Sequence, residues 1–124
     1  MDNETLMRSY YAAYNSEDAA QLAPLLAEDV VLVSTAGEQS GRDAYLATYR
    51  WMIATFEDRM TPERIAADAT GATVDIHDRL VARVDVDDFL GMSPRAGEVI
   101  ELNLNGRYTI RDGRIARIEI GPRA

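Results

Sequence analysis

The chain has 124 residues, with 13 basic and 21 acidic side chains, a formal net charge of −8, no cysteine and one histidine. This length fits a single domain, residues 1–124, that buries roughly two-thirds of the surface of its unfolded chain. The composition excludes disulfides, a cysteine nucleophile and zinc sites built from several cysteine or histidine ligands. The negative charge argues against nucleic acid or an anionic membrane as a partner, because phosphate binding needs concentrated Lys and Arg.

The first third of the chain predicts two helices and a short strand. Apolar and aromatic residues recur at three- and four-residue spacing over residues 3–15, which predicts an amphipathic helix. Ser16 or Asp18 can cap a second helix over residues 19–27, and residues 30–33 read as a short buried strand. The acidic N-terminus lacks a signal-peptide core and no apolar run reaches membrane-spanning length, so we expect a cytoplasmic protein without a membrane partner.

The middle of the chain predicts a loop over residues 34–41 and then the longest helix, from Arg42 to about Arg59. Residues 60–78 carry two conflicting patterns. Thr61-Pro62-Glu63-Arg64 is typical of a helix start, whereas residues 72–76 alternate like a strand. We expect a bent or interrupted strand here, with His77-Asp78-Arg79 as the turn into the next strand.

That next strand, Leu80–Asp87, places Arg83 and Asp85 on one face and Leu80, Ala82, Val84 and Val86 on the other, because alternate side chains of a strand point the same way. If the first face borders a pocket, Arg83 holds the carboxylate ionised and Asp85 can act as an acid or base. If it borders water, the two form a surface ion pair worth less than about 1 kcal/mol. Alternation alone would make this the polar, solvent-facing side of the strand.

The last part of the chain predicts two further strands. After a loop over residues 91–97, residues 98–111 alternate strictly, and Asp112-Gly113 is a hairpin signal leading into residues 114–120. The apolar face of the first of these strands carries Ile100, Leu102, Leu104, Tyr108 and Ile110. Helices followed by strands make an α+β pattern, in which three N-terminal helices pack on a strongly curved antiparallel sheet and leave a cone-shaped hollow.

Five stretches carry a resemblance to the nuclear transport factor 2-like superfamily, which includes ketosteroid isomerase, limonene epoxide hydrolase and the SnoaL-type polyketide cyclases. They are residues 15–20, 26–30, 41–44, 89–92 and 111–115. The resemblance covers nearly the whole chain apart from residues 60–76, and it implies the cone-shaped, cystatin-like fold of that superfamily. One fold hosts many functions, so the resemblance does not by itself specify a reaction.

The segment Arg83-Val84-Asp85-Val86 is similar to a tetrapeptide of limonene epoxide hydrolase, and this similarity implies that Arg83 and Asp85 point into the hollow. Leu32 and Ser34 stand where that family has a water-holding Tyr and Asn, and Ile120 stands where it has a second Asp. The two-carboxylate mechanism of that family is therefore not predicted.

Tyr10 matches the tyrosine of the ketosteroid isomerase oxyanion hole. Ser34 stands at the position of the base, and the protonated Asp of that family falls at Gly106 or Asn105. Because a serine cannot shuttle a proton at neutral pH, steroid isomerisation by that route is not predicted either.

From these features we predict a small SnoaL-like or ketosteroid-isomerase-like enzyme without metal or cofactor. It would carry out proton transfer, ring opening or ring closure on an apolar, oxygen-bearing molecule. Asp85 would be the acid or base, Arg83 its electrostatic partner, and Tyr10 or Tyr14 the donor to a developing oxyanion. The residues expected to contact the ligand are Met7, Tyr11, Leu32, Ser34, Trp51, Leu102, Leu104, Tyr108, Ile118 and Ile120.

Two alternatives stay open, a non-catalytic binding protein for an apolar ligand and a structural dimer module whose hollow is filled. The alternative role for Tyr10, Tyr11 and Tyr14 is that of amphipathic core residues with their hydroxyls at the rim. The resemblance also implies a homodimer through the convex face of the sheet, to which Leu80, Ala82, Val84 and Val86 would add apolar area.

Overall fold

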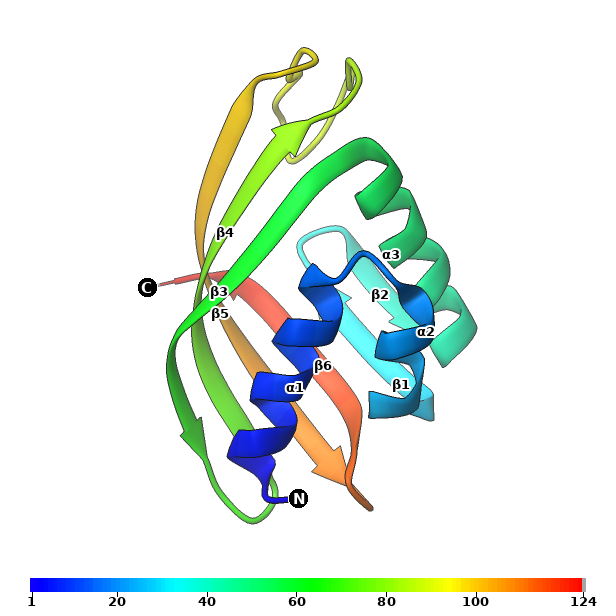
Figure 1. The fold of residues 1–124 in the computed structure, drawn as a ribbon, viewed down its shortest axis with the longest axis vertical. Coiled ribbons are helices and arrows are strands. Elements are labelled where there is room, and N and C mark those ends of the chain that lie inside the picture. Colours follow the sequence, from blue (N-terminus) through cyan, green and yellow to red (C-terminus); the bar gives the residue numbers. More distant parts are fainter. Residues whose placement is uncertain (124) are drawn as a thin grey trace.

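A computed structural model describes residues 1–123 and shows three α-helices and a short 3-10 turn packed on one face of a six-stranded sheet (Figure 1). The elements in chain order are α1 (Asn3–Asn15), α2 (Ala19–Leu22), η1 (Ala23–Leu25), β1 (Leu26–Ser34), β2 (Gly37–Ser40), α3 (Arg42–Thr55), β3 (Phe56–Ala67), β4 (Gly71–Ala82), β5 (Val99–Arg111) and β6 (Arg114–Pro122). The predicted α+β class, with three N-terminal helices on one sheet, is confirmed. No helix within residues 1–123 is long and apolar enough to cross a membrane.

The strands lie in the order β2-β1-β6-β5-β4-β3. All neighbours are antiparallel except β1 and β6, which pair in parallel through Val31↔Arg117 and Leu32↔Ile118. The expectation of a purely antiparallel sheet is therefore wrong. The chain leaves β1, completes the rest of the sheet, and only then returns beside β1 in the same direction, so the sheet is mixed.

The N-terminal elements begin at side-chain caps. The Asp2 carboxylate accepts a 2.7 Å hydrogen bond from the Thr5 amide at the start of α1, whose bounds match the predicted helix. The Asp18 carboxylate accepts a 2.9 Å bond from the Ala20 amide at the start of α2. The second helix is shorter than predicted, because the chain tightens into the 3-10 turn at Pro24 and β1 already begins at Leu26.

The middle of the chain differs most from its prediction. The expected loop over residues 34–41 contains β2, which pairs with β1. The long helix ends at Thr55 rather than Arg59, because Phe56 is already extended and residues 56–59 belong to β3. The ambiguous segment is a β3–β4 hairpin with a bulge between Pro62 and Arg64, closed by the Asp68 carboxylate, which accepts hydrogen bonds from Thr70 and Gly71.

The predicted turn at His77-Asp78-Arg79 is wrong. His77 lies within β4, where its register partners are Thr61 on β3 and Asn103 on β5. Strand β4 ends at Ala82, so the predicted strand 80–87 is correct only over its first residues. Leu80 and Ala82 are buried in a cluster with Phe56, against which Met52 of α3 packs, and are not on the convex face as expected.

Strand β5 confirms the predicted alternation, since Tyr108 is buried and Asn103 is exposed on the opposite face. The hairpin at Asp112-Gly113 is also confirmed. Both residues have positive φ angles, 54° and 73°, as a two-residue turn between twisted strands requires.

The concave side of the sheet holds two apolar clusters. The larger one lies between α1, α3 and the sheet, and all six tyrosines of the chain belong to it: Tyr10, Tyr11, Tyr14, Tyr45, Tyr49 and Tyr108. The smaller one contains Phe56, Leu80 and Ala82, with Phe89 from the β4–β5 connection packed against it at a ring separation of 4.7 Å from Phe56. The candidate site lies in the larger cluster.

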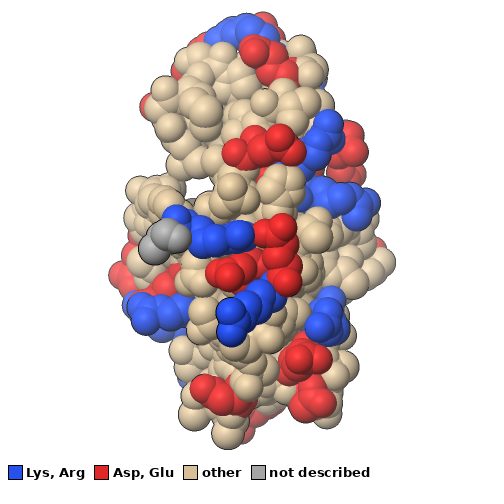
Figure 2. Space-filling view, turned by 90° about the vertical axis from the view of Figure 1, so that its left-hand side faces the viewer, with Lys and Arg blue, Asp and Glu red and all other residues tan. Residues whose placement is uncertain are grey.

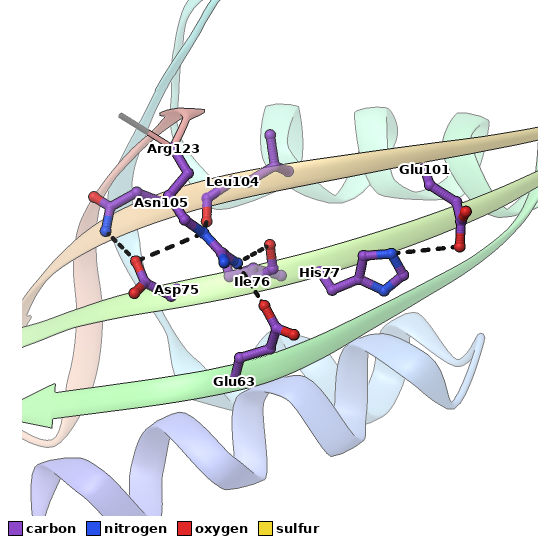
Figure 3. A network of polar contacts seen from close by, with 8 residues as sticks. All are labelled: Glu63, Asp75, Ile76, His77, Glu101, Leu104, Asn105 and Arg123. Carbon is purple, nitrogen blue, oxygen red and sulfur yellow. Dashed lines mark hydrogen bonds and ion pairs between the residues drawn. The ribbon is translucent and has the colours of Figure 1, made fainter.

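The opposite face of the sheet is polar, with basic and acidic side chains intermingled over it (Figure 2). The Arg123 guanidinium donates to Glu63 at 2.7 Å and to the Ile76 carbonyl at 2.9 Å, and its Nε donates to the Leu104 carbonyl at 3.4 Å (Figure 3). Arg123 thus joins β3, β4 and β5 from outside. The homodimer through this face stays a prediction.

Candidate functional site

An apolar cavity of about 130 Å³ opens between α1, α3 and the concave face of the sheet. Its wall is formed by Tyr10, Tyr14, Leu32, Tyr45, Thr48, Tyr49, Met52, Met60, Tyr108, Ile118 and Ile120. Helical spacing brings Tyr10 and Tyr14 to the same side of α1, and Tyr45 and Tyr49 to the same side of α3, because residues four apart are neighbours on a helix. The cavity is therefore bordered by two facing pairs of phenols.

The phenol hydroxyls bond mainly to one another. The Tyr10 and Tyr45 hydroxyls share a hydrogen bond across the helices, and those of Tyr11 and Tyr108 share one at 2.6 Å. Either member of each pair can be the donor. Two hydroxyls joined by one hydrogen bond use only one of their two O–H groups. One O–H of the Tyr10–Tyr45 pair is therefore left to donate to an oxygen atom in the cavity.

Burial keeps these phenols protonated. Loss of solvation is the largest cause that raises the pKa of Tyr10, Tyr14, Tyr45 and Tyr108 well above the usual tyrosine range. Desolvation also raises the pKa of Tyr49, to about 12, and the negative charge of Glu17 adds to it. At neutral pH these hydroxyls can therefore act as hydrogen-bond donors, and a proton acceptor has to come from another group.

Two carboxyl groups lie directly behind the tyrosine wall. Asp58 on β3 and Asp78 on β4 are only 4% and 3% exposed, and the Tyr14 hydroxyl donates a 2.8 Å hydrogen bond to Oδ2 of Asp58. Oδ1 of each carboxyl group has no hydrogen-bond partner within residues 1–123. No basic side chain within residues 1–123 forms an ion pair with either aspartate. Such burial is unusual for a charge that is not paired.

Burial, followed by hydrogen bonding to Asp58 and the charge of that neighbour, raises the pKa of Asp78 to about 10. Asp78 therefore carries a proton at neutral pH. Since two ionised carboxylates have no donor to offer each other, this proton is what allows the two side chains to lie together.

The structure brings together one part of the predicted site. Tyr10, Tyr14, Leu32, Tyr108, Ile118 and Ile120 all line the cavity. Met7 and Tyr11 are buried in the core outside the cavity wall, and Leu104 is half-buried against that core. Leu102 packs on the smaller cluster. Trp51 is 49% exposed, and Ser34 borders a shallow depression on the other side of the sheet together with Asn105.

The expectation that Arg83 and Asp85 face the hollow is wrong. Both follow the end of β4 and are exposed. Arg83 pairs with Glu17 at the α1–α2 junction. The Asp85 carboxylate accepts a 2.9 Å hydrogen bond from the Ala96 amide and lies 3.6 Å from Arg95, within its own loop. The alternative that the sequence left open, a surface ion pair, describes Arg83, although with Glu17 as its partner.

Sequence reasoning missed Asp58 and Asp78. The pattern contained a signal, because Phe56, Asp58 and Met60 alternate along β3, and Ile76, Asp78 and Leu80 alternate along β4. A carboxylate in the middle of an inward-facing row was read as a turn or as the polar face of a helix. Tyr45, Tyr49 and Met52 of α3 complete the cavity wall, and they were not among the residues expected to contact the ligand.

No group of three or more His, Asp or Glu side chains that could hold a metal ion occurs within residues 1–123.

Comparison with known proteins places this architecture in a known family. The family model of the SnoaL-like domain matches residues 7–118. A comparison with curated proteins found no match.

The solved structures that resemble this chain include a proposed polyketide cyclase of Xanthomonas campestris pv. campestris. It has a TM-score of 0.83 and 22% identity, and the match covers 98% of this chain and 90% of the other. A proposed polyketide cyclase of Pseudomonas putida KT2440 has a TM-score of 0.78 and 25% identity, over 97% of this chain and 90% of the other. An LEH-like epoxide hydrolase of M. tuberculosis has a TM-score of 0.77 and 17% identity, over 96% and 80%.

Proposed function

Because this chain belongs to the SnoaL-like domain family, within the nuclear transport factor 2-like superfamily, we propose that its tyrosine-lined cavity is the active site of a small acid/base enzyme. The substrate class is an apolar molecule of about one ring that carries a carbonyl, epoxide or hydroxyl oxygen. The reaction class is a proton transfer that leads to isomerisation, ring opening or ring closure.

One observation carries this proposal: the Tyr10–Tyr45 hydroxyl pair has an O–H to spare at the wall of an otherwise apolar cavity. A preorganised phenol donor stabilises negative charge that develops on a substrate oxygen, and it does so more strongly where water is excluded. Removing one such donor typically slows a reaction by about a hundredfold to a thousandfold.

The size of the cavity supports the substrate class. An apolar cavity of about 150 Å³ in another protein holds benzene, and the cavity here has about 130 Å³. The two volumes are close, so we propose a ligand of no more than one small ring, since ligand pockets for larger molecules run from about 300 Å³ upward. A substrate with several fused rings would require the helices to move away from the sheet.

A second candidate is a non-catalytic binding protein for the same kind of ligand. It is favoured by the composition of the cavity wall, which is built from Tyr, Leu, Ile, Met and Thr and contains no charged side chain among the described residues. Apolar walls with a few polar groups are typical of binding pockets in general.

Cyclohexenone in heavy water distinguishes the candidates, because it is a one-ring ketone with exchangeable protons next to its carbonyl group. We expect NMR to detect its binding in the cavity and deuterium uptake faster than in buffer. Tyr10→Phe and Tyr45→Phe should each slow that uptake by about a hundredfold, while binding falls far less. Binding without faster exchange would favour the binding protein. No binding of one-ring ketones or phenols would overturn both candidates.

A further inference from the structure

We propose that Asp58, Asp78 and Tyr14 form a buried proton relay, in which the two carboxyl groups share one proton and the Tyr14 hydroxyl passes protons between them and the cavity. The inference rests on the proposed function, since it names the proton acceptor that the cavity wall lacks. Tyr14 touches the cavity, and Asp58 and Asp78 act through it as positioning residues.

The geometry of the strands places the pair behind the wall. Asp58 and Met60 share the inward face of β3, and Met60 is the register partner of Asp78 on β4. Met60 and Tyr14 both line the cavity, so the carboxyl pair directly adjoins residues of the cavity wall. The connection is the 2.8 Å hydrogen bond from Tyr14 to Oδ2 of Asp58.

Two buried oxygens without partners argue for a role beyond packing. Oδ1 of Asp58 and Oδ1 of Asp78 each lack a donor within residues 1–123, although both side chains are more than nine-tenths buried. A buried polar atom left unsatisfied costs about 1–3 kcal/mol. A protonated carboxyl group is a hydrogen-bond donor, so a proton held between the two side chains would offset part of this cost.

The surroundings allow one negative charge and no more. The titratable groups near the pair are Tyr10 and Tyr14 from α1 and Tyr49 from α3. The charge of Asp58 is one of the causes that raise the pKa of each of these tyrosines. From β5 the register partner of Asp78 is the apolar Leu102. The phenols are neutral and Leu102 is apolar, so no side chain among these neighbours compensates a second negative charge on the carboxyl pair.

The relay moves one proton through two linked transfers. A ligand O–H gives its proton to Oη of Tyr14, while the hydroxyl proton of Tyr14 passes to Oδ2 of Asp58. The ligand oxygen keeps the electron pair of the broken O–H bond, and the spare O–H of the Tyr10–Tyr45 pair can stabilise it. Both carboxyl groups are then neutral, and the reverse step returns the proton to the ligand.

The relay can be tested without any ligand by infrared spectroscopy. A protonated carboxyl group has a C=O stretch that shifts when its O–H becomes O–D. In the wild-type protein at neutral pH we expect such a band from a buried carboxylic acid, and we expect Asp78→Asn to abolish it. Glu57→Gln is the matched control, because Glu57 precedes Asp58 on β3 and is exposed. It should leave the band unchanged.

After transfer into heavy water, the rate at which the carboxyl proton exchanges for deuterium measures how readily solvent protons reach Asp58 and Asp78. If protons reach it through Tyr14, Tyr14→Phe should slow exchange of the carboxyl proton at least tenfold. Tyr11→Phe removes a hydroxyl that bonds Tyr108 instead, and it should exchange as the wild type does. Asp58→Asn keeps Tyr14 and a hydrogen-bond acceptor for it but removes the carboxylate that takes up the proton. It should also slow exchange, so the link is tested even if Tyr14→Phe does not fold.

The absence of the band from the wild-type protein, or equal exchange rates in all variants, would overturn the relay. These results do not depend on cyclohexenone. If the infrared band and the exchange rates support the relay but the protein binds no ketone, the proposed function fails while this inference stands.

Discussion

The hydroxyl of Tyr14 donates a 2.8 Å hydrogen bond to Oδ2 of Asp58. It thereby links helix α1, which lines the cavity, to a buried carboxyl group on strand β3. The presence of Asp58 in turn contributes to the raised pKa of Asp78 on the neighbouring strand. Three elements, α1, β3 and β4, thus meet in one polar chain within an otherwise apolar core. Substitution of any of these three residues should change the free energy of unfolding as well as the properties of the cavity.

Asp78→Asn should raise the free energy of unfolding at neutral and alkaline pH. The pKa of Asp78 is raised to about 10 in the folded chain, whereas in the unfolded chain it lies near 4. Between these values the folded state binds one more proton than the unfolded state. Stability from this group is therefore complete below about pH 4 and is lost as pH rises toward about 10, with a slope of up to about 1.4 kcal/mol per pH unit.

Urea denaturation at several pH values measures this slope. Asparagine keeps the shape and donates to Asp58 without titrating, so the variant should show a flatter profile and should gain most over the wild type near pH 10. Identical slopes in the two proteins would mean that Asp78 is ionised in the fold.

Gly106→Ala should disturb the cavity from the sheet side. A Cβ at Gly106 would lie 2.8 Å from Cε2 and 3.0 Å from the hydroxyl oxygen of Tyr108. The ring would have to move, and its 2.6 Å hydrogen bond to Tyr11 would be lost. We expect a loss of about 1–3 kcal/mol in the free energy of unfolding. Thermal denaturation measures it, and Gly121→Ala is the control, because a Cβ there meets no atom within 4 Å.

Leu32→Phe should fill the cavity from β1 and exclude ligands. Leu32 lines the cavity and is half-buried, so the larger ring can occupy empty space rather than displace packed neighbours. Cyclohexenone affinity should fall at least tenfold, with a change in unfolding free energy of less than about 1.5 kcal/mol. Val33→Phe tests the adjacent position, which borders the shallow depression on the other side of the sheet. If both variants bind the ketone equally, the ligand lies elsewhere.

Arg83→Ala should have a small effect on stability. The Arg83–Glu17 pair is partly exposed, with about two-fifths of each side chain accessible to solvent, and such pairs contribute about 1 kcal/mol or less. Denaturation at low and high salt checks this, since screening should reduce even that contribution. A loss of several kcal/mol would show that the junction between α1 and α2 depends on this contact.

Local sequence signals predicted the elements whose side chains alternate cleanly. Strand β5 keeps apolar and polar residues on separate faces, and Asp112-Gly113 is a turn that the backbone geometry itself favours. The first helix has both an Asp cap and an aromatic stripe. These features depend on neighbours in the sequence, so the sequence suffices to find them.

The site could not be predicted in the same way, because its chemistry contradicts the local pattern. Asp78 occupies an inward position that an apolar residue normally fills, so the pattern at His77-Asp78-Arg79 resembled a turn. Residues 56–59 resembled the end of the helix, since Glu57, Asp58 and Arg59 suit a solvated face. Only the pairing of β3 with β4 turns Asp58 inward and brings it to Asp78, and that contact spans distant parts of the chain.

The division of aromatic residues between the two apolar clusters has a practical consequence. All six phenols belong to the larger cluster, which contains the cavity, and the single indole, Trp51, packs at a ring separation of 6.2 Å against Phe56 of the other cluster. Indole fluorescence and the near-ultraviolet circular dichroism of the phenols therefore report on different halves of the molecule. A compound that enters the cavity should perturb the phenol signal first, without any label attached to the protein.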